Sequence, residues 1–218
     1  MTRVIAGVAR GRRLAVPPGT GTRPTSDRAR EGLFSTLTAM RGTLAGAAVL
    51  DLYAGSGAVG LEALSRGAAR ALFVESDGRA ARVIRENLKT VGLPGGTVLA
   101  DKVARVLARG PAGVPVDRQQ QFGSDPAGGA RTEPLSNGYD IVVADPPYAA
   151  GDAEVTRMLA LLAERGWLAA GAIAVVERAT RSGTLAWPAG YAADRSRRYG
   201  EATFWYGLAA GIRPAGVS

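Results

Sequence analysis

Apolar residues follow two alternating spacings along most of the chain, from about residue 47 onward. Short continuous apolar runs, which are typical of strands buried in a parallel sheet, alternate with segments whose apolar residues recur at helical spacing. The strands predicted in this way span residues 48–52, 71–75, 97–100, 139–144 and 172–177. The predicted helices span residues 58–65, 78–91, 101–108 and 152–164. The alternation predicts an α/β fold with a doubly wound sheet that carries helices on both faces.

Different patterns precede and follow this alternation. The Thr-Ser-Asp sequence at residues 25–27 offers a helix cap, and apolar residues recur at helical spacing over residues 33–40. Near the other end, residues 195–199 and 202–208 flank Gly200. Two short segments around a glycine predict an antiparallel hairpin that closes the sheet.

Two segments carry little periodicity and divide the chain. Residues 110–138 are rich in Gly, Pro, Gln and Ser and predict a mobile surface insertion. Residues 210–218 predict a frayed tail. We therefore expect a basic extension with a hairpin and a helix over residues 1–42, followed by the α/β domain over residues 43–209.

Positive charge is concentrated in the first 30 residues, which hold seven arginines against one aspartate in a chain of net charge +8. Glycines and prolines interrupt this stretch, so an extended arm or a small hairpin is predicted. Arginine binds phosphates well, so we expect a polyanionic partner, nucleic acid before membrane. A solvated basic tail is the alternative. The arginines at positions 195, 197 and 198 either extend this basic surface or protect an edge strand from aggregation.

The chain of 218 residues contains neither cysteine nor histidine. This excludes disulfides, a thiolate nucleophile, an imidazole base and a Cys/His zinc site, and we expect no metal. Any chemistry must use carboxylates, hydroxyls, Lys, Arg, backbone groups or a cofactor. There is no long apolar segment and no apolar leader at the N-terminus. We therefore expect a cytoplasmic protein with no membrane partner.

A glycine motif follows the first predicted strand of the sheet. Gly55, Gly57 and Gly60 form a G-x-G-x-x-G pattern between that strand and the next helix, which is the setting of nucleoside-binding loops. Glu75 ends the following strand, where an acid accepts hydrogen bonds from ribose hydroxyls. The alternative is a turn that only packs helix against strand.

Two aspartates bear on which nucleoside would bind. Asp51 ends the first strand, where a carboxylate repels a pyrophosphate such as that of NAD but suits the sulfonium and ammonium groups of S-adenosylmethionine. Asp101 follows the third strand and is placed either to meet an adenine amine or to cap the next helix. The pattern favours S-adenosylmethionine over NAD.

A second motif, Asp-Pro-Pro-Tyr at residues 145–148, ends the fourth predicted strand. Ligands of α/β sheets bind at this edge. The Asp145 carboxylate and the Pro146 carbonyl can each accept one N–H of an exocyclic amine on a base, while Tyr148 can stack on that base. Methyl transfer to such an amine depends mainly on positioning. The alternative is a proline-terminated strand with a surface tyrosine.

Three sequence blocks resemble the bacterial 16S ribosomal RNA guanine-N2 methyltransferases of the RsmD type. The first block is the arm RVIAGVARGRRL at 3–14 followed by RPTSDRAREGLF at 23–34. The others are VLDLYAGSGAVGLEALSRGA at 49–68 and DPPY at 145–148, and a weaker one is RRYGEATFWY at 197–206. The glycine and DPPY motifs are shared by many amino-methyltransferases, whereas the basic arm narrows the resemblance to this family. Residues 110–138 depart from it, since the family usually has a shorter loop there.

The resemblance implies a Rossmann-like, seven-stranded class I methyltransferase that uses S-adenosylmethionine to methylate N2 of a guanine in 16S rRNA, within a 30S ribosomal subunit or an assembly intermediate. We expect a monomer. The implied catalytic residues are Asp145, Pro146 and Tyr148. The implied cofactor-binding residues are Asp51, Tyr53, Gly55, Gly57, Glu75 and Asp101. The implied RNA-binding residues are Arg10, Arg12, Arg13, Arg23 and Arg28.

Other functions remain open on the same residues. The acid-Pro-Pro-Tyr chemistry also suits methylation of DNA adenine or of a protein glutamine amide. An NAD-dependent oxidoreductase would use the glycine loop, and a ribosome-assembly factor would bind RNA without catalysis. Methylation of a base carbon through a cysteine adduct is excluded, because the chain has no cysteine.

Overall fold

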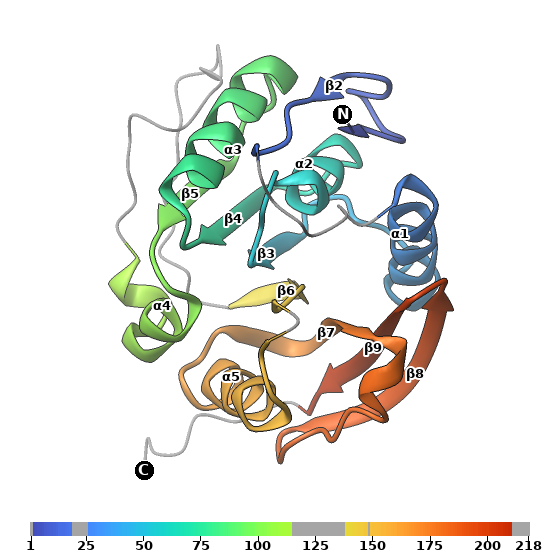
Figure 1. Ribbon diagram of the computed structural model, residues 1–218, viewed down its shortest axis with the longest axis vertical. Helices are drawn as coiled ribbons and strands as arrows, with labels where there is room; N and C mark the ends of the chain where they lie inside the picture. The colour runs from blue at the N-terminus through green and yellow to red at the C-terminus, as the bar shows by residue number, and fades with distance from the viewer. Residues whose placement is uncertain (1, 19–25, 115–137, 148, 211–218) are drawn as a thin grey trace.

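A computed structural model describes residues 2–18, 26–114, 138–147 and 149–210 of the chain (Figure 1). Its centre is a seven-stranded sheet of order β5-β4-β3-β6-β7-β9-β8. The first five strands in this order run parallel, and β9 pairs antiparallel with both β7 and β8. The strands are β3 (Ala48–Leu52), β4 (Arg70–Glu75), β5 (Gly96–Ala100), β6 (Tyr139–Ala144), β7 (Leu168–Ala179), β8 (Tyr191–Tyr199) and β9 (Ala202–Ala209).

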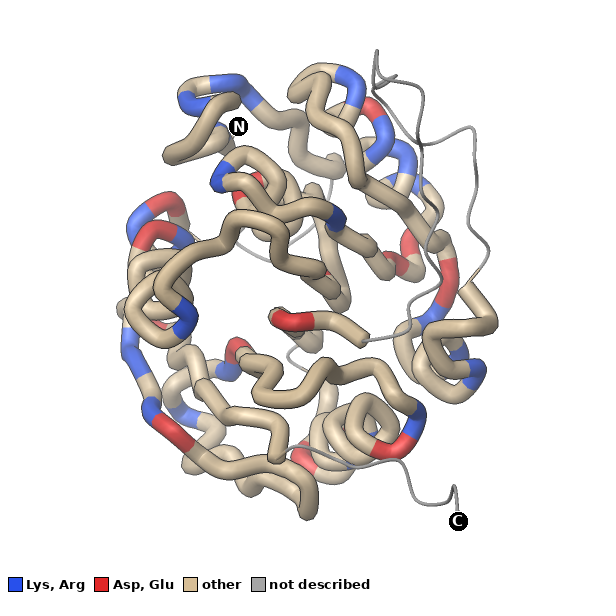
Figure 2. Tube along the Cα trace, turned by 180° about the vertical axis from the view of Figure 1, so that it is seen from behind, with Lys and Arg blue, Asp and Glu red and all other residues tan. Residues whose placement is uncertain are grey.

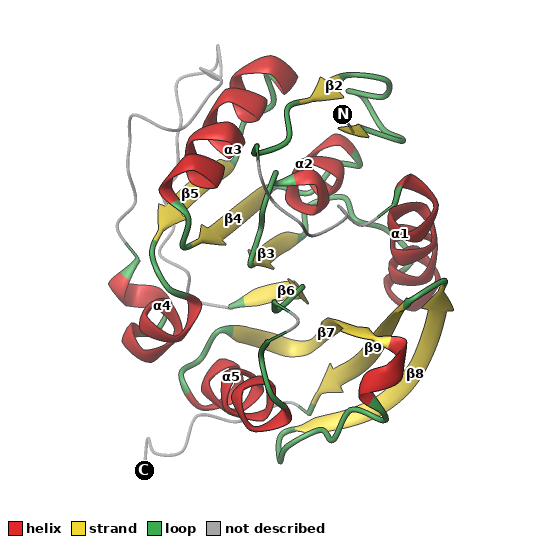
Figure 3. Cartoon of the chain, viewed as in Figure 1, coloured by secondary structure: helices red, strands yellow, loops and turns green. Residues whose placement is uncertain are grey.

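Helices cover both faces of this sheet, as the sequence predicts (Figure 3). The helices are α1 (Asp27–Arg41), α2 (Ala58–Ser65), α3 (Gly78–Val91), α4 (Val103–Arg109) and α5 (Asp152–Glu164), with short 3-10 turns at Pro111–Gly113 and Thr180–Ser182. Helices α1, α2 and α3 pack on one face, and α4 and α5 pack on the other. Among the described residues no helix is both long and apolar enough to cross a membrane.

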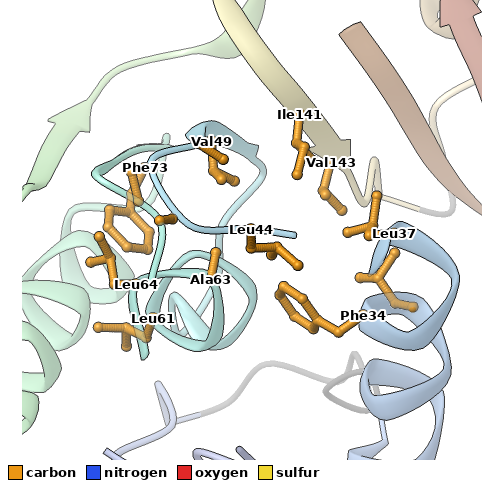
Figure 4. Packing of buried hydrophobic residues seen from close by; sticks show 14 of the residues in the cluster. Phe34, Leu37, Leu44, Val49, Leu61, Ala63, Leu64, Phe73, Ile141 and Val143 are labelled. Carbon is orange, nitrogen blue, oxygen red and sulfur yellow. The ribbon is translucent and has the colours of Figure 1, made fainter. Parts of the chain in front are cut away.

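The core under α1 and α2 shows why these segments form their elements. In Figure 4, Leu37 of α1 lies toward Val143 of β6, Phe34 of α1 lies beside Leu44, and Leu64 of α2 lies next to Phe73 of β4. Phe34 and Leu37 are each 1% exposed, so the apolar stripe of α1 is fully buried. Burial of side chains of this size contributes about 1.5–3 kcal/mol each. The packing fixes α1, and with it the N-terminal extension, on the sheet.

The predicted strands and helices of the sheet are confirmed; most bounds agree to within one residue, and three elements differ by more. Strand β7 begins at Leu168, four residues before the prediction, because the small residues there lack an apolar pattern. Strand β8 begins at Tyr191 rather than at 195, since an exposed edge strand needs no alternation. Helix α4 begins at Val103, and its capping position is Lys102, which makes no side-chain cap. The helix cap considered for Asp101 is therefore wrong.

The N-terminal extension forms the small hairpin that the sequence allowed as one of two possibilities. Strand β1 (Thr2–Arg3) pairs antiparallel with β2 (Arg13–Leu14), and apolar residues of the hairpin join the core shared with α1 and α2. The predicted insertion at 110–138 and the predicted tail at 210–218 fall mostly outside the described residues. The predicted division at residue 42 stays a prediction.

Buried polar side chains pin this hairpin to the helices. Glu62 of α2 is fully buried and accepts hydrogen bonds from the backbone N–H groups of Ile5 and Ala6, at 2.6 and 2.9 Å. Arg66 donates to the same carboxylate at 2.7 Å. Asn87 of α3 exchanges two hydrogen bonds with the backbone of Ala15. The extension is thus a fixed part of the molecule over residues 2–18.

Candidate active site

Strand register brings four carboxylates to the carboxyl edge of the sheet. Asp51 of β3 pairs with Phe73 on one side and with Val143 on the other. Val143 pairs in turn with Val175 of β7. Two residues beyond these partners, on the same face by side-chain alternation, lie three more acids. These acids are Glu75, Asp145 and Glu177. They form one row at the ends of β4, β6 and β7. Asp51 lies two residues further back along its strand, on the same face.

The four acids line one cavity of about 320 Å³. The glycine loop forms one wall, and the start of the Asp-Pro-Pro motif forms another. The N-terminal hairpin contributes Val16 and Pro17, and the segment around the Thr180–Ser182 turn contributes Arg181. The cavity therefore joins the two sequence motifs that were predicted to act together. It lies outside the carboxyl ends of the strands, at the place where α/β sheets bind ligands.

The glycine loop has a backbone that few residues adopt. Tyr53 has a φ of 58°, and it is the one non-glycine residue with positive φ in the described part of the chain. Gly55 and Gly57 follow with φ of 56° and 76°. Such strained positions cluster at ligand sites. Tyr53 and Gly55 line the cavity, whereas Gly57 points into the core, where an added Cβ would lie 3.0 Å from Ile84 Cγ2.

Glu75 ties this loop to the end of β4 through one carboxylate oxygen and orders the start of α3 through the other. One oxygen accepts a hydrogen bond from the Gly55 N–H at 2.9 Å, and the other accepts from the Asp77 N–H at 2.8 Å. Each oxygen keeps a second lone pair, so contact with ribose hydroxyls is still possible. Glu75 thus shapes the loop besides facing the cavity.

Asp51 lies deepest among the acids, with 4% of its surface exposed. Its carboxylate accepts a hydrogen bond from the Gly60 N–H at 2.9 Å, which ties the first turn of α2 to the end of β3. Burial raises the pKa of Asp51 to about 7, and repulsion by Glu75 adds to the rise, while the Gly60 hydrogen bond opposes it.

Asp145 is exposed on the side that opens into the cavity, and protein surrounds its carboxyl group elsewhere. Removal from bulk water raises the pKa of Asp145 to about 8, with further repulsion from Glu177 and then from Asp51. Pro146 and Pro147 line the cavity next to it. Tyr148, the last predicted catalytic residue, lies outside the described residues. The carboxylate and the following prolines meet the cavity together, as the motif predicts.

Asp101 is the predicted site residue that lies apart from this cavity. It borders a smaller depression beside α4, and its carboxylate pairs with Arg105 and Arg109 at 3.5 and 3.3 Å. It also accepts a hydrogen bond from the Lys102 N–H. Its predicted contact with an adenine amine stays a prediction.

Four of the predicted RNA-binding arginines lie on the surface of the extension and of α1. Arg10, Arg13 and Arg28 are exposed. Arg12 is exposed too, and its guanidinium donates a hydrogen bond to the Thr90 carbonyl at 2.7 Å. Arg23 lies outside the described residues. Figure 2 shows basic positions along the N-terminal hairpin, along α3 and along the outer strand β8. The described arginines thus remain available to a polyanion.

Two residues at the cavity were not singled out from the sequence. Glu177 ends the predicted strand 172–177, so its position at a strand end was a signal that it would reach this edge. Arg30 is 1% exposed and donates to Thr2 Oγ1, to the Arg3 carbonyl and to Asp27. A buried arginine within a basic segment carries no sequence signal, because its partners are brought together only by folding.

The donor set of the cavity fits a cationic nucleoside cofactor. The pKa values of Asp51 and Asp145 are both raised, because each carboxyl group is held away from bulk water and lies near other acids. A nearby cation relieves such repulsion, while a pyrophosphate would increase it. S-adenosylmethionine carries a sulfonium and an ammonium, so the residues present fit this cofactor better than NAD.

Comparisons with known proteins agree with this arrangement. A family model described as "Conserved hypothetical protein 95" matches residues 2–207. Ribosomal RNA small subunit methyltransferase D of Escherichia coli is 35% identical over 202 residues, covering 93% of this chain and 87% of that protein. A solved structure from Escherichia coli, named provisionally as a methyltransferase, has a TM-score of 0.76 at 31% identity and covers 97% of this chain and 99% of its own.

A more distant solved structure shows the same fold. Magnesium protoporphyrin IX methyltransferase from Synechocystis, with bound S-adenosylmethionine, has a TM-score of 0.57 at 15% identity. The match covers 84% of this chain and 79% of that one. It supports the seven-stranded class I methyltransferase fold that the sequence predicts.

Proposed function

The chain belongs to the RsmD family of small-subunit ribosomal RNA methyltransferases, and from this premise we propose that it methylates the exocyclic N2 amine of a guanine in 16S rRNA, using S-adenosylmethionine. One observation carries the proposal. Asp145 and Pro146 open into the same cavity as the Gly55 loop. An amine held by the Asp-Pro-Pro-Tyr motif therefore faces a cofactor held by the glycine motif.

The cofactor side of the cavity is formed by β3, β4 and the loop between β3 and α2. We assign Glu75 to the ribose hydroxyls, and Asp51, Tyr53 and the backbone around Gly55 and Gly57 to the rest of the cofactor. When bound, S-adenosylmethionine supplies an electrophilic methyl group next to a positive charge. That charge favours the ionised form of Asp145, whose pKa is raised by its surroundings in the protein.

Asp145 and Pro146 act on the base. The ionised Asp145 carboxylate and the Pro146 carbonyl each accept one N–H of the guanine amine, which fixes the orientation of its lone pair. Tyr148 supplies a ring face for stacking on the base. When the nitrogen gains the methyl carbon it becomes acidic, and Asp145 accepts the proton that it loses. The raised pKa of Asp145 suits this role.

The extension carries the RNA contacts in this proposal. Arg10, Arg12, Arg13, Arg23 and Arg28 bind phosphates of the 16S rRNA in a 30S subunit or an assembly intermediate. Glu62 fixes the hairpin on α2, so Arg10, Arg12 and Arg13 are presented on a fixed surface. We place the reaction in the cytoplasm, with the enzyme acting as a monomer and without a metal.

Methyl-transfer assays test the proposal. Tritiated S-adenosylmethionine is supplied with 30S subunits from cells that lack this gene, with naked 16S rRNA, with DNA and with peptides. We expect label in the 30S subunits or rRNA, and loss of transfer in Asp145→Ala with cofactor affinity within about tenfold, or 1.4 kcal/mol, of the wild type. Label in DNA or peptide, or binding of NAD in place of S-adenosylmethionine, would contradict it. Unchanged turnover by Asp145→Ala would reject the catalytic role of that carboxylate.

A further inference from the structure

Glu177 lies beside Asp145 on the side away from the glycine loop. The parallel register pairs Ala144 of β6 with Val176 of β7, so the next residues along the two strands, Asp145 and Glu177, are lateral neighbours. Both line the cavity. Glu75, which holds the glycine loop, lies across β3 on the opposite side. Glu177 therefore borders the part of the cavity that is left for the accepting base.

The surroundings of Glu177 suit a planar base. Phe204 of β9 pairs with Glu177 in the sheet register and also lines the cavity. Arg178 turns to Asp152, to which it donates a hydrogen bond at 2.6 Å. Arg181 and Ser182 follow at the rim. An apolar ring, a carboxylate and a basic rim thus occur together on the acceptor side.

Guanine presents two kinds of N–H group next to each other. The N2 amine accepts the methyl group, and the ring N1–H lies beside it on the same edge of the base. In adenine and cytosine, the ring nitrogen beside the exocyclic amine carries a lone pair and no hydrogen. A carboxylate at this position accepts a hydrogen bond from guanine but faces a lone pair on adenine or cytosine, which costs binding energy.

Resting on the proposed function, we propose that Glu177 reads the N1–H of the target guanine while Asp145 holds its N2 amine. The two neighbouring carboxylates match the two neighbouring donors of guanine. Asp145 serves the reacting amine, so Glu177 determines which base is accepted. The Asp-Pro-Pro-Tyr motif alone can bind any exocyclic amine. Glu177, which neighbours the motif across the sheet, therefore determines which base is methylated.

A base that keeps the amine but lacks the N1–H separates the two roles. 2-Aminopurine has its amine at the same carbon as guanine and a bare lone pair at N1. The methylated position is mapped first, and 30S subunits are then reconstituted with 16S rRNA that carries guanine or 2-aminopurine there. We expect the wild-type enzyme to methylate the 2-aminopurine subunits on the order of 10–100-fold more slowly.

Glu177→Gln should reverse part of this preference. The glutamine amide can donate an N–H to the bare N1 of 2-aminopurine, and its oxygen can still accept from guanine. We expect the guanine-to-2-aminopurine rate ratio to fall by about tenfold or more, on the scale of one such contact. Loss of O6 in 2-aminopurine affects both enzymes equally, so the change in ratio isolates N1. The fluorescence of 2-aminopurine reports binding independently of methyl transfer, and Glu177→Gln should bind these subunits more tightly than the wild type.

Glu164→Gln is the matched control, because Glu164 is an exposed glutamate at the end of α5 that does not line the cavity. It should keep the wild-type ratio. Methylation of 2-aminopurine by the wild type within threefold of guanine would overturn the role of Glu177, as would an unchanged ratio in Glu177→Gln. Failure of the wild type to methylate guanine subunits would instead reject the proposed function, and this role with it.

Discussion

At the scale of single residues, the cavity brings together carboxylates that repel one another. Asp51 and Asp145 have pKa values raised to about 7 and about 8, and the principal cause for both is burial. A carboxylate whose pKa is higher in the folded than in the unfolded chain favours folding most when it is protonated. The site is thus arranged for a cation, and the free protein is less stable near neutral pH than its packing alone would give.

The sign of this effect gives a stability prediction for Asp145→Asn. The contribution of Asp145 is fully present below its unfolded pKa near 3.8 and is lost as pH rises through its folded pKa of about 8. The neutral asparagine removes the repulsion, so the cofactor-free variant should melt above the wild type at pH 8. The difference should vanish at pH 4. Thermal unfolding at the two pH values measures it, and equal melting temperatures at pH 8 would contradict the raised pKa.

Individual site residues differed in how well the sequence predicted them. Glu75 and Asp145 end strands that were recognisable from apolar runs, and their arrival at one cavity was predictable from parallel topology. Asp101 also follows a strand, yet it turns to the arginines of α4 instead. The end of a strand determines where a residue lies along the sheet. The direction of its side chain depends on neighbouring side chains, whose placement cannot be predicted from the sequence.

At the scale of elements, the hairpin and α1 are held to α2 by buried charge. Glu62 is fully buried and is contacted by two backbone N–H groups and by Arg66, while Arg30 lies 3.9 Å away with 1% of its surface exposed. Burial lowers the pKa of Arg30, and Asp27 and Glu62 oppose this. Such a cluster defines one arrangement of the extension, because each charge depends on the others for compensation.

Glu62→Gln tests the contribution of this buried charge cluster to stability. The substitution keeps the shape but leaves Arg30 and Arg66 without the buried counter-charge, so the free energy of unfolding should fall by about 3–5 kcal/mol. Urea denaturation measures the change. Glu31→Gln is a matched control on the exposed surface of α1 and should stay within about 0.5 kcal/mol of the wild type. If the free energy of unfolding falls no further in Glu62→Gln than in the control, the buried charge cluster contributes little to stability.

The elements of the sheet were more predictable than those of the extension. Runs such as Tyr139–Ala144 have no alternative to a buried strand. The two-residue strands Thr2–Arg3 and Arg13–Leu14 are too short for any periodicity, and they exist because Glu62, Ser65 and Asn87 accept or donate hydrogen bonds to their loop. Tertiary contacts stabilise these strands, so no local sequence pattern predicts them.

At the scale of the whole molecule, charge is divided between a basic surface and an acidic cavity. The chain has a net charge of +8, yet five acidic residues line the cavity beside three arginines. Exposed arginines of the hairpin lie on the outside, where they attract phosphates, while the interior row attracts a cation. The molecule thereby presents a positive electrostatic potential to the proposed RNA and a negative one to the proposed cationic cofactor.

Arg10→Ala combined with Arg13→Ala tests the basic surface. Both arginines are exposed, so their removal should weaken binding to 30S subunits and lower the slope of log affinity against log salt by about 1–2. Filter binding across a salt series measures the slope. Arg157→Ala, an exposed change on α5 at the opposite face of the sheet, should leave the slope unchanged. An equal slope in the double variant would place the hairpin away from the RNA.

The most direct measurement of the central claim is to map N2-methylguanine in 16S rRNA from cells with and without this gene, and from deleted cells that express the wild type or Asp145→Ala. We predict that one methylated guanine disappears on deletion, returns with the wild type and stays absent with Asp145→Ala. An unchanged 16S methylation pattern in the deleted cells, or full restoration by Asp145→Ala, would contradict the account.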